Sequence, residues 1–195
     1  GSSITLWYKD GKFGIASRNL GKPLTITKVV GRRNKTLLEK IVFWKKPDLN
    51  IYEEQECDSD FVKHGRPYLN KLIEYCERTK QNLVLQGELC GQNMKGSGNK
   101  NNPHAKEPTD IIFFNACKYE HQSIRLSEKE FQQICWDLNL PSSPIYFNRQ
   151  FNTIEEIKKE CEDTFNKSLV EGIVIRDENH NFSCKYMSSL YDSMK

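Results

Sequence analysis

Four charged side chains lie in or beside short apolar stretches, where a charge is costly to bury. Glu88 and Glu171 each lie at the edge of a hydrophobic stretch, and Arg18 and Lys185 lie in similar positions. An ionised carboxylate in such a place needs a cationic partner or a metal ion. If the four side chains converge, they form a cleft that fits a phosphate together with Mg²⁺, which prefers oxygen ligands. The alternative is that each charge points to solvent from an exposed face of a sheet.

Two adjacent phenylalanines could add a nucleobase to such a phosphate site. Phe113 and Phe114 lie within the strongly apolar stretch 111–119. An aromatic ring that faces a cleft can stack on a base. Successive side chains of a strand point to opposite faces, and the pattern leaves open which of the two rings faces the cleft.

The elements that position these side chains are predicted to form an α+β fold, with mainly antiparallel sheets and flanking helices. Strands are expected over 4–8, 13–17, 83–89, 111–119, 172–176 and 182–187, and helices over 60–81, 127–138 and 154–165. Asp10-Gly11 between the first two strands is typical of a hairpin turn. Ser127 and Thr153 are predicted helix caps, and Pro67 is expected in the first turn of its helix.

Three connecting stretches are expected to lack regular structure for most of their length. Residues 21–47 are predicted to be irregular, although 24–30 contains a run of β-branched residues, and 141–147 is predicted to be a loop leading into a short strand. Two stretches are also basic: 32–46 has six Lys or Arg and a single acid, and 91–106 has three lysines and no acid. Such stretches suit a phosphate backbone, and the alternative is an ordinary solvated surface.

Composition is that of an ordinary globular protein. Of the 195 residues, 37% are hydrophobic and 28% are charged, with a net charge of +3. No apolar run approaches the roughly 18 residues of a membrane span. The seven cysteines are spread singly without a Cys-x-x-Cys pair, which argues against a disulfide framework or a zinc site. This pattern indicates a reducing, intracellular compartment, cytoplasmic or nuclear.

Five segments, in this order, resemble the motifs of the covalent nucleotidyltransferases, which comprise ATP-dependent ligases and mRNA capping enzymes. The closest likeness is to RNA ligases of the RNA-ligase-2-like kind, and it extends over nearly the whole chain. The segments are Ser17-Arg18-Asn19, Gln86-Gly87-Glu88-Leu89-Cys90-Gly91, Phe113-Phe114-Asn115, Glu171-Gly172-Ile173-Val174-Ile175-Arg176 and Ser183-Cys184-Lys185-Tyr186-Met187-Ser188. Each motif is weak alone, and their order makes the resemblance specific.

The resemblance implies a nucleotidyltransferase domain of the ATP-grasp-like ligase kind, using ATP and Mg²⁺ or Mn²⁺. Such an enzyme seals 5′-phosphate and 3′-OH RNA ends, or a nicked duplex, through lysyl-AMP and RNA-adenylate intermediates. By this resemblance Glu88 binds the ribose, and Phe114 stacks on adenine with Phe113 as the fallback. The remaining implied roles are Lys185 at the α-phosphate, Glu171 at the metal and Arg18 at the RNA end.

The first motif of the family, Lys-x-Asp-Gly, has no full counterpart in residues 1–195. The best alignment places Gly1 at its last position, so the nucleophilic lysine is expected three positions before Gly1. Lys9-Asp10-Gly11 lacks the spacer residue of the motif. The chain alone is therefore expected not to adenylate itself, and an N-terminal OB-type domain would suit the full-length protein. Alternatives are a DNA ligase, a capping-type nucleotidyltransferase, or a non-catalytic module that binds RNA ends.

The fifth motif departs from many relatives, which carry two lysines two positions apart. Here Ser183 and Met187 flank Lys185 at that distance. The resemblance therefore implies one phosphate-binding lysine in this motif instead of two.

Overall fold

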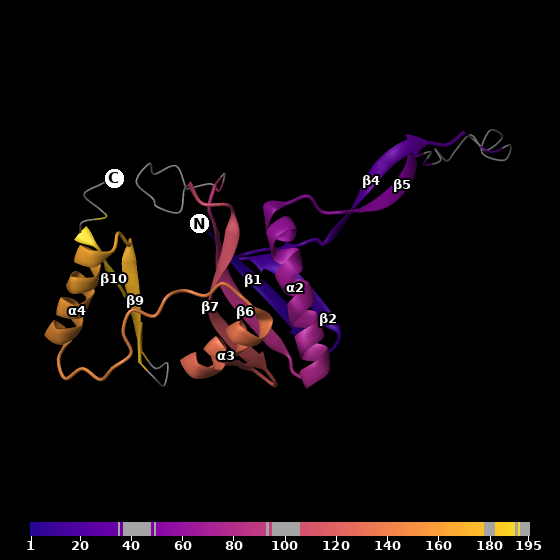
Figure 1. Cartoon of the computed structure of the whole chain (residues 1–195). Coiled ribbons are helices and arrows are strands. Elements are labelled where there is room, and N and C mark those ends of the chain that lie inside the picture. Colours follow the sequence, from indigo (N-terminus) through magenta and orange to yellow (C-terminus); the bar gives the residue numbers. More distant parts are fainter. Residues whose placement is uncertain are drawn as a thin grey trace.

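The largest unit is an antiparallel sheet of six strands in the order β3-β2-β1-β6-β7-β8 (Figure 1). The computed structural model describes residues 1–34, 36, 48, 50–92, 94, 106–177, 182–189 and 191. The strands are β1 (Ser2–Lys9), β2 (Lys12–Ser17), β3 (Gly21–Lys22), β6 (Leu83–Cys90), β7 (Asp110–Tyr119) and β8 (Ser123–Arg125). The β1–β2 hairpin turns at Asp10 and Gly11, both with positive φ, as predicted.

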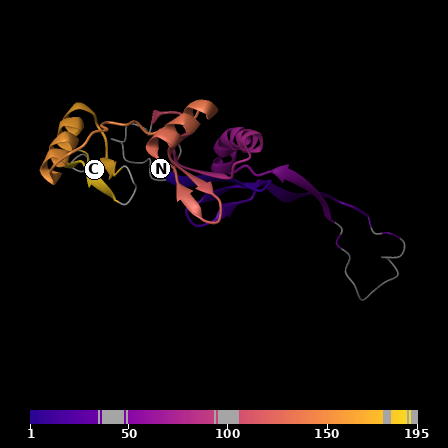
Figure 2. The same cartoon turned by 90° about the horizontal axis from the view of Figure 1, so that it is seen from below.

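Two helices, α2 (Asp60–Thr79) and α3 (Glu128–Leu138), cover one face of this sheet. Figure 2 shows both on the same side of the strands. Along β1, Ile4, Leu6 and Tyr8 are buried against the helices, whereas Thr5 and Trp7 point the other way and are half-buried. The same alternation along β6 buries the odd-numbered residues 83–89. The opposite face, called here the open face, carries Ser3, Thr5, Trp7, Val84, Gln86 and Glu88.

A β-bulge in β7 changes which residues of that strand reach the open face. Phe113 pairs with Gly87 and Asn115 pairs with Gln86, so Phe114 is the extra residue. A bulge of this kind bends the strand and re-aims its side chains. Ahead of the bulge the odd-numbered side chains face the helices, whereas behind it Asn115 follows Gln86 onto the open face.

The C-terminal part is a smaller unit with its own core. Helix α4 (Ile154–Lys167) packs on a ribbon of β9 (Gly172–Arg176) and β10 (Ser183–Met187) (Figure 1). Cys161, Phe165 and Ile173 form this core. Residues 139–153 join it to the sheet, and this segment is held to β7 by two hydrogen bonds of 2.8 Å, from Phe113 N to Pro141 O and from Ser143 N to Phe113 O.

The second ribbon, β4 (Thr25–Arg32) with β5 (Asn50–Glu56), projects away from the sheet (Figures 1 and 2). The prediction of irregular structure over 21–47 is therefore wrong for β4, and β5 was not predicted. Most residues of the ribbon are exposed, including Val29 and Tyr52. A strand that buries neither face shows no apolar alternation, which is the signal that sequence analysis uses. Most of the basic stretch 32–46, and most of 91–106, lies outside the described residues.

Helix starts were predicted well, with one exception. Ser127 and Glu130 form the predicted capping box, and the Thr153 side chain caps α4. Pro67, however, lies inside α2, because the Ser59 side chain caps the helix at Val62 N and so starts it at Asp60. Proline cannot donate to the carbonyl four residues earlier, but Pro67 and Lys63 are exposed, so water can reach that carbonyl.

The segment before α4 differs from its prediction, whereas the class of fold agrees with it. No strand follows the loop 141–147, where a short one was expected; Phe147 instead packs edge-on against Phe151. The remaining predicted strands and helices are present, and the α+β class with antiparallel sheets is confirmed.

No helix within the described ranges has the length and apolar character needed to span a membrane.

Candidate active site

Two of the predicted site residues form an ion pair. Lys185 Nζ in β10 lies 2.9 Å from Glu171 Oε1, just ahead of β9. Both residues lie near the same end of the ribbon, where Glu171 O accepts a 2.9 Å hydrogen bond from Ser188 N just beyond β10. The Lys185 and Glu171 side chains are 47% and 53% exposed. An ion pair this exposed adds at most about 1 kcal/mol to stability, so the pair is better placed to meet a ligand than to hold the fold.

The β9–β10 ribbon has two different faces. Ile173 and Tyr186 point toward α4, where the Tyr186 ring stacks on Phe165 at 5.9 Å. Val174 and Lys185 are paired with each other and point the opposite way, a surface called here the ribbon face. Val174 is 50% exposed. The ribbon face therefore offers an aliphatic side chain beside a cation.

Arg176, at the end of the ribbon face, joins this unit to the sheet. Its Nη1 donates to the backbone oxygen of Phe114 at 3.1 Å. Its Nε is buried and has no hydrogen-bond partner among the described residues. Burial lowers the pKa of Arg176 from its usual value, and the nearby positive charge of Arg125 lowers it further. The contact places the ribbon face beside β7 and beside the residue predicted to stack on a base.

A row of polar side chains crosses the sheet beside this contact. Arg125 Nε donates to Asn115 Oδ1 at 2.7 Å, and Asn115 Nδ2 donates to Gln86 Oε1 at 2.6 Å. Asn115 is only 8% exposed, so it requires these partners. The row and Arg176 received no role from the sequence. The signal that could have found them was the same one used for Glu88, a polar residue within an apolar strand.

Glu88 and Arg18 lie at one end of the sheet. Glu88 is 54% exposed, pairs with Ser3 in β1, and has Oε1 at 3.4 Å from the amino group of Gly1. Arg18 directly follows β2, whose Ser17 pairs with Ile4. With one strand between them, the two backbones are about 10 Å apart at the usual spacing of strands. Arg18 is exposed and has no recorded ion pair in the described part of the chain.

The two phenylalanines are clearly distinguished by burial. Phe113 is fully buried and meets Tyr68 of α2 edge-to-face at 5.3 Å. Phe114, at the bulge, is half-buried. A ligand cannot reach the Phe113 ring, so this fallback for base stacking finds no support, and Phe114 is the candidate.

The predicted residues thus fall into two groups. Glu171 and Lys185 touch, and Arg176 connects their ribbon to Phe114. Glu88 and Arg18 lie at one end of the sheet. Glu88 pairs with Ile112 of β7, and Ile112 is two residues from Phe114 along that strand. Two residues along a strand span about 7 Å. No hydrogen bond or ion pair between described residues joins the two groups directly, and their members line neither the cavity beside the first turns of α2 nor the hollow beside the β1–β2 turn.

The acidic residues of the site decide how a metal ion could bind there. In the part of the chain that the structure describes, no group of three His, Cys, Asp or Glu side chains could hold a metal ion. Glu171 is thus a single carboxylate. Mg²⁺ commonly binds one or two carboxylates and takes its other ligands from substrate phosphates and water. The site fits a metal that arrives with a nucleotide better than one held by the protein alone.

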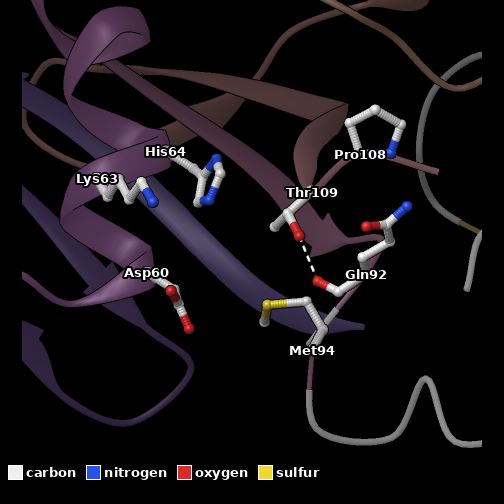
Figure 3. Close-up of a pocket in the computed structure, with 7 residues that line it drawn as sticks. All are labelled: Asp60, Lys63, His64, Gln92, Met94, Pro108 and Thr109. Carbon is white, nitrogen blue, oxygen red and sulfur yellow. Dashed lines mark hydrogen bonds between the residues drawn. The ribbon is translucent and has the colours of Figure 1, made fainter. Parts of the chain in front are cut away.

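A separate cavity of about 330 Å³ lies beside the first turns of α2. Figure 3 shows Lys63 and His64 on the helix, with Thr109 and Gln92 near the ends of β6 and β7. The Thr109 hydroxyl donates to the backbone oxygen of Gln92. None of the predicted site residues lines this cavity, and we do not include it in the candidate site.

Comparisons with known proteins bear on the chain as a whole. Residues 1–187 match the family model described as RNA ligase. The structure is similar to solved structures of Naegleria gruberi RNA ligase, and these likenesses show the fold. For a variant with AMP and Mn, the TM-score is 0.63 at 22% identity, covering 100% of this chain and 49% of that one. For a variant with ATP and Mn, the TM-score is 0.62 at 21% identity, and the match covers 100% of this chain and 49% of that one.

A third Naegleria gruberi structure, RNA ligase with PPi, has a TM-score of 0.62 at 21% identity, covering 99% of this chain and 48% of that one. The chain therefore spans about half the length of the solved ligases it matches. No curated protein matches it.

Proposed function

Because this chain belongs to the RNA ligase family, we propose that it is the nucleotidyltransferase domain of an ATP-dependent RNA ligase. The match of residues 1–187 to the family carries this proposal. The nucleophilic lysine is proposed to lie three positions before Gly1. The Gly1 nitrogen lies 3.4 Å from Glu88, so a preceding segment would begin beside the residue proposed to bind the ribose. The full-length protein is proposed to contain an OB-type domain ahead of this one.

The proposed reaction has three displacement steps at phosphorus. The neutral amine of the upstream lysine attacks the α-phosphorus of ATP, forming a P–N bond and breaking the bond to pyrophosphate. A 5′-phosphate oxygen of the RNA then attacks the adenylate phosphorus and breaks that P–N bond. Finally the 3′-OH attacks the 5′-phosphorus, and AMP leaves. Splitting the reaction through a covalent intermediate is nucleophilic catalysis.

The residues of the ribbon face would act on the charge of the phosphates. Lys185 would place its ammonium against the α-phosphate, where negative charge increases as the new bond forms. A preorganised charge at that position lowers the barrier. Glu171 holds Lys185 Nζ at 2.9 Å before a nucleotide binds. It would also supply a carboxylate oxygen to Mg²⁺ or Mn²⁺ bound with the nucleotide, which adds further neutralisation of phosphate charge.

The sheet would hold the nucleoside and the RNA. Phe114 would stack on adenine, and Val174 on the ribbon face could contact the other side of the base. Glu88 would accept a hydrogen bond from a ribose hydroxyl. Arg18 would contact the phosphate at the RNA end or nick, since a guanidinium matches phosphate oxygens in geometry and charge.

The test of this proposal is an assay of the full-length protein with ATP labelled at the α-phosphate. We expect a labelled protein adduct that transfers its label to a 5′-phosphorylated RNA. We also expect sealing of a nick when the 3′-OH strand is RNA. An adduct that seals equally well with a DNA 3′-OH strand would favour a DNA ligase. An adduct that forms from GTP instead of ATP and passes GMP to a 5′-diphosphate RNA end would favour a capping enzyme. A protein that binds RNA ends but forms no adduct would be a non-catalytic module.

The two phenylalanines should respond differently to replacement by alanine. Phe113→Ala should lower the free energy of unfolding by about 3–5 kcal/mol, because it empties a fully buried site. Phe114→Ala should leave the fold intact and raise the KM for ATP about 10-fold, since one base–aromatic stack contributes about 1–3 kcal/mol. Thermal unfolding and the ATP dependence of adduct formation measure the two effects. The opposite pattern, with Phe113→Ala weakening ATP binding in a stable protein, would exclude Phe114 as the stacking residue.

Arg176→Ala should weaken ATP binding, although Arg176 is not proposed to contact the nucleotide. The variant loses the hydrogen bond to Phe114 O that connects the ribbon to the sheet, and a hydrogen bond from a charged donor contributes about 1.5–3 kcal/mol. We expect the KM for ATP to rise about 10-fold, measured by the rate of adduct formation. Arg149→Ala is the matched control, because Arg149 pairs with Glu160 of α4 and, among the described residues, forms no hydrogen bond or ion pair with Phe114 or the ribbon face. Equal KM values for Arg176→Ala and the control would show that the contact does not organise the site.

A further inference from the structure

A second hollow lies on the open face of the sheet, at the end where the β1–β2 hairpin turns. It has a volume of about 270 Å³ and is lined by Trp7, Tyr8, Lys9, Val84 and Tyr119. None of these residues has a role in the proposed reaction. Val84 and Glu88 are both on the open face of β6, four residues apart. The hollow is therefore about 14 Å along the strand from the proposed ribose site.

The Trp7 indole lies over the neighbouring strand. Trp7 pairs with Gly14 of β2. A Cβ atom added at Gly14 would lie 2.9 Å from both Cζ2 and Nε1 of the indole and 3.0 Å from Cε2. The nearest atoms belong to one edge of the indole, so that edge lies over the glycine, and Trp7 also lines the hollow. The glycine is required, because any side chain at this position would displace the ring.

A lysine is held at the rim of the same hollow. Lys9 Nζ lies 3.9 Å from the centre of the Tyr119 ring, which is a cation–π contact. Lys12 pairs with Lys9 across the turn and adds a second positive charge. The acid of this turn, Asp10, accepts a hydrogen bond of 2.9 Å from the Asn82 side chain. The hollow therefore combines an aromatic surface with the ammonium group of Lys9, and Lys12 is the neighbouring residue across the turn.

We propose that this hollow binds an unpaired nucleobase of the RNA substrate, with the base stacked on Trp7 and the adjoining phosphate at Lys9. Aromatic surfaces flanked by cations bind single-stranded nucleic acid with little sequence preference, because every base has a π-face. A separation of about 14 Å equals about four steps of a stacked strand at about 3.4 Å each. The bound nucleotide therefore lies about four positions from the proposed ribose site. The inference rests on the proposed function in one respect, namely that RNA is the substrate.

Tryptophan fluorescence tests the stacking directly. Replacing Trp44, Trp136 and any tryptophan outside residues 1–195 by phenylalanine in the full-length protein leaves Trp7 as the fluorophore. The probe is a single-stranded oligoadenylate of about eight nucleotides, roughly twice the proposed separation. We expect saturable quenching by this RNA and none by AMP at the same nucleotide concentration. Equal quenching by AMP would show that Trp7 belongs to the adenylate site, and this result would overturn the proposal.

Variants provide a second measurement of the same site. Trp7→Ala should weaken binding of the oligoadenylate about 5- to 100-fold, and Trp7→Phe should retain most of the affinity. Trp136→Ala is the matched control, because Trp136 on α3 is 83% exposed and should leave binding unchanged. Lys9→Ala should reduce the slope of log affinity against log salt by about one. Equal affinities for Trp7→Ala and Trp136→Ala, in folded proteins, would overturn the proposal.

The outcomes separate this inference from the proposed function. If the unaltered protein forms an adduct with ATP and seals RNA but Trp7 is not quenched, the hollow is not an RNA site and the function stands. If Trp7 is quenched by RNA but no adduct forms with ATP, the RNA site stands and the function fails.

Discussion

Lys185→Ala in the full-length protein should slow formation of the adenylate adduct about 100- to 1,000-fold, the usual cost of removing one group that stabilises developing charge. Lys185 is the only lysine that the fifth motif supplies, since Ser183 and Met187 occupy the flanking positions. No second lysine of that motif is present to replace its charge. Single-turnover measurement with labelled ATP gives the rate. Lys185→Arg should recover part of it, because the charge is kept and the geometry changes.

Lys158→Ala is the matched control, because Lys158 is an exposed lysine of α4 in the same unit. It should react at the wild-type rate. The fold of the Lys185 variant should be unaffected, because its exposed ion pair contributes at most about 1 kcal/mol. A Lys185→Ala protein that melts like the wild type and reacts within a few-fold of it would remove Lys185 from the site.

Glu171→Ala should abolish adduct formation at limiting Mg²⁺. This substitution removes the carboxylate proposed to contact the metal and also releases Lys185 from the 2.9 Å pair. We expect a loss of about 100-fold or more, with partial recovery at high metal concentration. Glu171→Gln should behave similarly, since the amide keeps the shape but loses the charge. Adduct yield across a Mg²⁺ titration is the measurement.

Asp163→Ala on α4 is the control for loss of an exposed acid in the same unit. A double variant, Glu171→Ala with Lys185→Ala, tests whether the two residues act together. Coupled residues show effects that do not add, so the double variant should be little worse than the poorer single one. Near-normal adduct yield from Glu171→Ala at limiting Mg²⁺ would refute the assignment.

The parts of the fold that were predicted correctly are those set by nearby residues. The turn at Asp10-Gly11 and the caps at Ser127 and Thr153 depend on residues within four positions of each other. The strands that bury one or both faces were visible because apolar residues mark them. The β4–β5 ribbon lacks a buried face. Helix α2 accommodates Pro67 in its interior because Pro67 and Lys63 are exposed to solvent. Neither property can be read from a short window of sequence.

The residues of the candidate site could be predicted from the sequence, but their positions relative to one another could be predicted only in part. Glu171 and Lys185 were expected in one site, and they form an ion pair. The hydrogen bond from Arg176 to Phe114 O joins residues 62 apart in sequence, so no local pattern indicates it. The burial of Phe113 follows from its pairing with Gly87, and the position of the bulge at Phe114 is set by the pairing of β7 with β6. The roles of Glu88 and Arg18 stay predictions.

The bulge at Phe114 also has a consequence for mutational scanning of this protein. Ile111 and Phe113 point to the helices, whereas beyond the extra residue it is Ala116 that is buried and Lys118 that reaches Glu130 on α3. The alternation of sensitive and tolerant positions should therefore shift phase by one residue at position 114. A deletion of Phe114 would remove the bulge and place Phe113 directly before Asn115, so the later side chains of β7 would keep their faces and their pairing with β6. The fold should thus tolerate the loss of this one residue, although the bend that the bulge produces would be lost.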